Sequence, residues 1–152
     1  MKNEFTPDKK AENSWILYDV ANSAFVLVVV TAILPIFFKD VVAKDLAPST
    51  STAYWGYINS AASFMVACFS PLIGALADQS RRKKKFFASF LFLGLLATAA
   101  LTFIQQGQVF LCLTTFLLAR IGWSGANLFY DSFLSDVTSK SRMDKVSSRG
   151  YG

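Results

Sequence analysis

The chain has 152 residues, of which 53% are hydrophobic and 16% charged, and its formal net charge is +5. Soluble domains usually carry about 25% charged residues, so the composition disfavours a soluble globular protein. The apolar residues form four blocks of 19 to 26 residues, and a helix needs roughly 20 to cross a bilayer. A soluble four-helix bundle would show a polar face at helical period, whereas Val26–Leu34 and Phe86–Leu96 are apolar nearly all round.

Because lipid offers the backbone no hydrogen-bond partner, each span must be a helix. We therefore predict an all-α integral membrane protein with four transmembrane helices that contacts the lipid bilayer directly. In chain order the predicted elements are a cytoplasmic tail at 1–14, spans at 15–38, 54–77, 86–104 and 109–134, and a cytoplasmic linker at 135–152.

The basic residues predict the orientation of these spans. One side of the membrane would hold twelve of the 15 Lys and Arg residues, including the run Arg81–Lys85, and the other side would hold two, Lys39 and Lys44. The positive-inside rule then places both ends of the chain and the Arg81–Lys85 turn in the cytoplasm. The positive net charge thus follows from membrane orientation, and we expect no nucleic-acid partner.

Ionisable groups inside a span are costly and mark functional sites by default. In the fourth span Arg120, Ser124, Asn127 and Asp131 follow one another at steps of four, three and four residues, which places them on one helix face. Arg120 would lie near mid-membrane, with Asp131 roughly 16 Å closer to the cytoplasm. We expect this polar stripe to face a water-filled cavity or another helix.

The first span carries a second polar face with Asp19 and Asn22 in its cytoplasmic third. The functional interpretation is that both faces line one solute cavity, in which Arg120 attracts an anionic group and Asp19 or Asp131 carries a coupling proton. The structural interpretation is that Asp19 lies at headgroup level and that a buried Arg–Asp pair only holds helices together. Both interpretations stay open at this point.

The end of the second span and the turn that follows it contain Gly74, Leu76, Ala77 and Asp78, and then Arg82 and Lys83. This pattern resembles the signature loop of the major facilitator superfamily, although Gln79 and Arg81 stand where that superfamily usually has a basic residue and a glycine. The resemblance implies that the loop gates a conformational change. Gly74 would allow close packing, Asp78 would find cationic partners, and Arg82 and Lys83 would hold the loop inside.

Three further stretches resemble the vacuole-effluxer branch of that superfamily and its bacterial relatives. They are the segment from Trp15 to Phe25, the run Phe129–Leu134, and the late run Val146–Tyr151. The resemblance implies a twelve-helix transporter in two six-helix halves, of which this chain would form the amino-terminal part, completed by missing carboxy-terminal helices of the same protein. It also implies that the first and fourth helices line the central cavity, and that amino acids are a candidate substrate, because yeast-type members export them from the vacuole.

We therefore expect a secondary active transporter of a small polar solute, in a bacterial cell membrane, or in a vacuolar membrane if the source is eukaryotic. The sequence lacks the phosphate-loop pattern, and we expect no enzymatic activity, cofactor or metal site. Two alternatives remain: a complete four-helix exporter working as an oligomer, and a membrane scaffold subunit without transport activity. The strong charge bias argues against an exporter that inserts in both orientations, and a scaffold would not predict matched polar faces on two helices.

Overall fold

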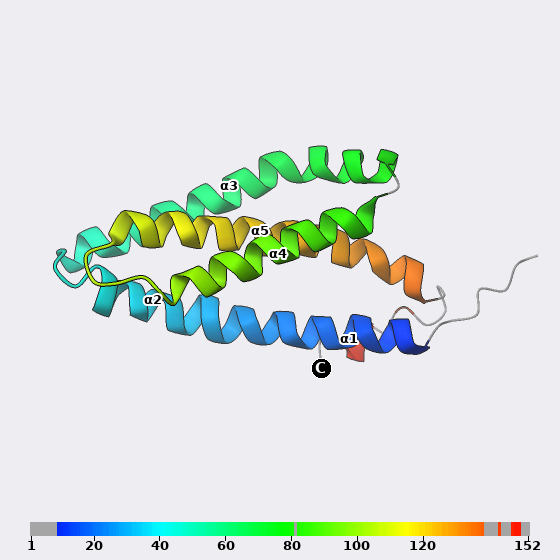
Figure 1. Cartoon of the computed structure of the whole chain (residues 1–152), viewed down its shortest axis with the longest axis horizontal. Helices are drawn as coiled ribbons and strands as arrows, with labels where there is room; N and C mark the ends of the chain where they lie inside the picture. Colours follow the sequence, from blue (N-terminus) through cyan, green and yellow to red (C-terminus); the bar gives the residue numbers. More distant parts are fainter. Residues whose placement is uncertain (1–8, 81, 139–142, 144–146, 150–152) are drawn as a thin grey trace, which may run out of the picture. The chain divides into compact units, whose positions relative to one another are not determined.

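The computed structural model describes residues 9–80, 82–138, 143 and 147–149, and for 76–80 and 134–137 it describes the backbone alone. The predicted tail at 1–14 and linker at 135–152 therefore lie largely outside the described residues. The elements, in chain order, are α1 (Lys9–Ala24), η1 (Phe25–Ile33), α2 (Leu34–Phe37), η2 (Phe38–Val42), α3 (Pro48–Ser80), α4 (Lys83–Leu101) and α5 (Val109–Val137) (Figure 1).

Four helical stretches are long and apolar enough to cross a membrane, so the predicted all-α, four-span fold is confirmed. They are Lys9–Val42, Pro48–Ala75, Lys83–Leu101 and Val109–Phe133. Two of them begin about six residues before the predicted apolar blocks, because polar residues can continue a helix into the headgroup region. No β-strand occurs among the described residues.

The first span is not a uniform α-helix. It widens into π-helical turns at η1 and again at η2, on either side of the short α2, and the Ala43 N–H closes η2 by donating to the Phe38 carbonyl at 2.8 Å. Pro35 lies in α2 and has no N–H to donate, which disturbs the regular ladder around it. The Thr31 hydroxyl donates to the Val26 carbonyl at 2.9 Å, five residues back, and so follows the same wider turn.

The described contacts divide the chain into two compact units, residues 1–33 with 130–152, and residues 34–129. In the second unit, α3, α4 and α5 run alongside one another (Figure 1). Its core at one end is aromatic. The Trp55 ring lies between those of Phe38 and Phe116, with centroid distances of 5.4 and 4.6 Å, and both phenylalanines are fully buried.

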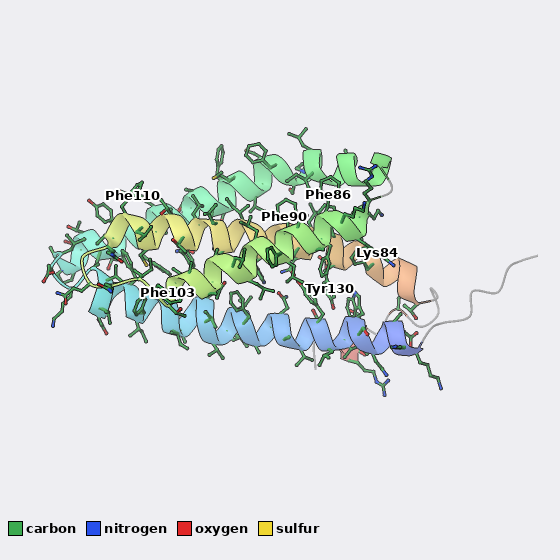
Figure 2. The ribbon with its side chains drawn as sticks, viewed as in Figure 1. Lys84, Phe86, Phe90, Phe103, Phe110 and Tyr130 are labelled. Atoms are coloured by element: carbon green, nitrogen blue, oxygen red, sulfur yellow. The ribbon has the colours of Figure 1, made fainter. Side chains whose placement is uncertain are left out.

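Helices α4 and α5 meet main chain to main chain. A Cβ added at Gly122 would lie 2.4 Å from the Gly94 nitrogen and 2.9 Å from the Phe90 carbonyl oxygen, and one added at Gly125 would lie 2.4 Å from the Phe90 ring. Only glycine permits an approach this close. Phe90 and Phe86, one turn apart on α4 (Figure 2), then lie against Phe129 of α5, with ring centroids 6.2 and 5.8 Å from that of Phe129.

The turn between α4 and α5 is tied to the end of the first span. Gly107 adopts a φ of 84°, which favours glycine, and its N–H donates to the Val42 carbonyl at 2.9 Å. The Gln106 side chain donates to Asp45 at 3.1 Å. These two hydrogen bonds join the end of η2 and the connection between η2 and α3 to the turn between α4 and α5.

Candidate functional site

The first unit buries a polar face of α1. Glu12, Trp15 and Asp19 are its buried residues, and their spacing of three and four places them on one side of the helix. Asp19 is 3% exposed, and its Oδ2 atom accepts no hydrogen bond from any described group. A buried carboxylate oxygen without a donor is costly, so Asp19 does not resemble a solvent-exposed helix cap, and its functional role stays a prediction.

Asp131 is the second acidic candidate, and the structure brings it near Asp19. The side chain of Asp131 is exposed, yet it lies close enough to Asp19 for the two carboxyl groups to interact electrostatically, and Tyr18 lies near both. Asn22, one turn along α1 from Asp19, is half-buried. Three of the predicted cavity residues thus belong to the same unit.

An aromatic clamp, formed by Trp15 and Tyr130, holds this region together. The two rings stack with centroids 4.6 Å apart. The Trp15 indole N–H donates to the Tyr130 carbonyl at 3.3 Å, and the Tyr130 hydroxyl donates to the Trp15 carbonyl at 3.0 Å. One further bond, from the Thr138 hydroxyl to Glu12 at 2.6 Å, ties the same two segments.

The remaining cavity candidates lie on α5 in the second unit. Arg120 is half-buried, with its guanidinium 5.2 Å from the Trp123 ring centroid and with no acceptor for its Nε among the described groups. Stacking on an indole stabilises the charge but leaves that N–H available for an acceptor. Asp19 and Asp131 belong to the other unit, so the structural interpretation of a locked Arg–Asp pair stays a prediction.

Ser124 and Asn127 are the other two predicted cavity residues on this part of α5. Both are half-buried, but Ser124 lines a separate apolar groove between α3, α4 and α5. Asn127 makes an interaction of its own. That Arg120, Ser124 and Asn127 line one cavity stays a prediction.

The four gating candidates occupy helix ends rather than a loop. Gly74 and Asp78 both belong to α3, Arg82 is the N-cap of α4, and Lys83 begins that helix. No described atom lies within 4 Å of a Cβ placed at Gly74, so the close packing expected there is found instead at Gly94 and Gly122. The side chain of Asp78 lies outside the described residues, and its expected cationic partners stay a prediction.

Sequence reasoning missed the clamp and the glycine contact. By its position in the sequence, Trp15 is an ordinary aromatic residue at the end of a span, and its partner Tyr130 is 115 residues away. Gly122 and Gly125 form a small-residue pair in a span, which is a signal for close approach, but nothing in the sequence indicates Gly94 as the facing residue.

Among the described residues no group of His, Cys, Asp or Glu could hold a metal ion.

Four spanning helices with buried ionisable groups in the first and the last define an integral membrane protein of the polytopic α-helical class.

The comparisons with known proteins extend this assignment. The family described as vacuole effluxer Atg22 like matches residues 47–149. An "Uncharacterized MFS-type transporter YxiO" of Bacillus subtilis is 46% identical over 153 residues, covering 100% of this chain and 35% of the relative. An "Uncharacterized protein" of Aquifex aeolicus is 31% identical over 127 residues, covering 84% of this chain and 31% of the relative. No solved structure matches the chain.

The chain belongs to the vacuole effluxer Atg22-like family. The resemblance inferred from the sequence motifs is thereby confirmed. The chain spans about a third of the length of the curated relatives it matches.

Proposed function

We propose that this chain provides the amino-terminal four helices of a secondary transporter of the major facilitator type, which moves a small polar solute by alternating access between two halves. The observation that carries the proposal is the pair of unsatisfied ionisable atoms, Asp19 Oδ2 and Arg120 Nε, each buried in a spanning helix. Evolution tolerates such groups in a membrane when they serve a solute or ion pathway. The family match and the name of the Bacillus subtilis relative support the same class.

Arg120 is assigned the binding of an anionic group of the solute. Its planar guanidinium presents several N–H donors to a carboxylate, and the Trp123 ring on its face leaves its edge for an incoming ligand. Amino acids are the solute class that we propose to test first, because each carries such a carboxylate. An amino acid also carries a positively charged ammonium group, which an acidic side chain would suit. Asp19 and Asp131 are the candidates for that role.

Removal of the Arg120 side chain tests this role. We expect Arg120→Ala to lower uptake of radiolabelled amino acids into membrane vesicles by roughly tenfold or more, because a hydrogen bond to a charged group contributes about 1.5–3 kcal/mol. Arg120→Lys keeps the charge but loses the fork geometry of the guanidinium. Its uptake should therefore lie between that of the unaltered protein and that of Arg120→Ala. Vesicles would be prepared from cells that express the whole gene, with protein amounts matched by immunoblot.

Lys44→Ala, which removes an exposed cation in the link after the first span, is the matched control and should transport normally. Normal uptake by Arg120→Ala would contradict the assigned role. Loss of folded protein in both Arg120 variants would instead favour a structural role for Arg120, and absence of uptake in the unaltered protein for every amino acid tested would remove that solute class.

A further inference from the structure

The groove that contains Ser124 is apolar along nearly all of its wall. Met65, Phe69 and Ile73 of α3 form one side, Phe90 of α4 closes it, and Ile121 and Leu128 of α5 form the floor. Its volume is about 100 Å³. Phe69 is 51% exposed, so the groove opens along the flank of these three helices.

Four consecutive cations lie at one end of the groove. This basic collar consists of Arg82, Lys83, Lys84 and Lys85, in the N-cap and first turn of α4, and that turn contains no acidic residue. Arg82, Lys84 and Lys85 are exposed. Figure 2 shows Lys84, Phe86 and Phe90 along the beginning of α4.

The collar and the groove share a helix face at a spacing that one molecule can bridge. Lys83 precedes Phe90 by seven residues, which is two turns, so both positions lie on nearly the same face of α4. The axial separation is about 10 Å at 1.5 Å per residue. A ligand with a phosphate at the collar and a hydrocarbon chain directed along the helices would therefore reach Phe90 and continue toward Met65.

An anionic phospholipid has both of these parts. We propose that the groove and the basic collar together bind one anionic phospholipid of the leaflet on the side of the α3–α4 turn, with an acyl chain in the groove and the headgroup phosphate on the collar. Clusters of Lys and Arg next to a span attract anionic lipids. Met65, being unbranched and flexible, can adapt to a mobile chain. This inference depends on membrane insertion and not on the proposed transport activity.

Lipid binding can be measured on the purified full-length protein in detergent by native mass spectrometry, with dioleoyl phosphatidylglycerol and dioleoyl phosphatidylcholine as probes. We expect the anionic lipid to bind the unaltered protein more tightly than the zwitterionic one. Lys84→Gln combined with Lys85→Gln should weaken the binding of the anionic lipid by roughly tenfold and remove the preference for it over the zwitterionic lipid. Lys39→Gln combined with Lys44→Gln makes the same change of charge on exposed residues elsewhere and should leave the preference intact.

Two outcomes of this titration would overturn the proposal. One is equal binding of the two lipids by the unaltered protein. The other is competition by glycerol phosphate, a headgroup without a chain, as effective as that of the whole lipid, because the groove would then contribute nothing.

The groove itself is tested by a photo-cross-linker, since a variant that fills it, such as Ser70→Phe, could also impair folding. With benzoylphenylalanine at the Phe69 position, illumination of cells should give a protein–phospholipid adduct detectable by mass spectrometry. A cross-link to another segment of the same protein would mean that a helix covers the groove, and would refute the proposal. The same cross-linker at the Tyr57 position, a highly exposed residue of α3 outside the groove, serves as the control for random lipid contact.

Discussion

Gly122 shows how much a single hydrogen atom can decide at the residue scale. Its Cα faces the main chain of Gly94, so the two helices are separated by no side chain at this level. The aromatic residues on either side gain from this approach, because Phe86 and Phe90 can then reach Phe129. The packing of α4 on α5 therefore depends on a residue that contributes almost no surface of its own.

We expect Gly122→Ala to destabilise the protein by about 1–3 kcal/mol, because the new methyl group would meet rigid backbone atoms and force the helices apart. The measurement is the thermal midpoint of the detergent-solubilised protein. Gly56→Ala is the matched control, since a Cβ at Gly56 meets nothing within 4 Å and alanine is the better helix former. Equal midpoints for the two variants would contradict the close contact.

The sequence indicated which residues to single out better than it indicated what surrounds them. Asp19 and Arg120 stood out because charges are rare in spans, and both prove to have unsatisfied atoms. Ser124 was grouped with Arg120 by helical period alone, although the two positions differ by about 40° around the helix axis, and the structure places Ser124 in the groove lined by α3 and α4. Period gives the direction of a side chain from its own helix axis and says nothing about which helix is opposite.

At the scale of elements, the aromatic clamp joins α1 to the last turns of α5 through two reciprocal bonds to main-chain carbonyls. Because each ring donates to the backbone of the other residue, the clamp fixes the axial register of the two segments as well as their separation. Stacked aromatic pairs add about 0.5–1.5 kcal/mol beyond the area they bury. Asp19 lies one turn beyond Trp15, so the clamp also positions the acidic candidate.

Tyr130→Phe removes one of these two bonds and keeps the stack. We expect a loss of about 0.5–1.5 kcal/mol in unfolding free energy, the usual net value of one hydrogen bond. The test is chemical denaturation followed by circular dichroism in detergent micelles. Tyr57→Phe, at a side chain that is 71% exposed, should leave the free energy of unfolding unchanged. If Tyr130→Phe also leaves it unchanged, the hydrogen bond to Trp15 adds no stability.

Element type was predictable throughout, and element detail was not. Runs of about 20 apolar residues identify spans reliably because the bilayer imposes the length. The widened turns of η1 and η2 escaped prediction, since the residues of η1 (Phe25–Ile33) are apolar and suit an α-helix equally well. Helix α3 also extends to Ser80, past the predicted end of the second span at residue 77, because single Gly and Asp residues lower helix propensity without removing a backbone hydrogen bond.

At the scale of the whole molecule, a transporter of the proposed kind could be driven by a proton that binds on one side of the membrane and is released on the other. If Asp19 carries that proton, Asp19→Asn should still exchange solute across the membrane but should fail to accumulate it against a gradient. The measurement compares counterflow with pH-driven uptake in proteoliposomes of the full-length protein. Asp40→Asn, at an exposed carboxylate of η2, is the control.

The parallel variant Asp131→Asn separates the two acidic candidates. Normal pH-driven accumulation in both the Asp19 and the Asp131 variants would exclude either as the proton carrier. Loss of counterflow as well as accumulation would assign the affected residue to solute binding instead.

The division of the chain into two units has a consequence for biosynthesis. The unit of residues 34–129 is continuous in sequence, so its helices can assemble as soon as α5 leaves the ribosome. The other unit needs Trp15 to wait for Tyr130, which is 115 residues later, and α1 must therefore remain in the bilayer through the insertion of three more spans before it finds its partner. During that interval the carboxylate of Asp19, which is 3% exposed in the folded unit, lacks the cover that the clamp region gives it.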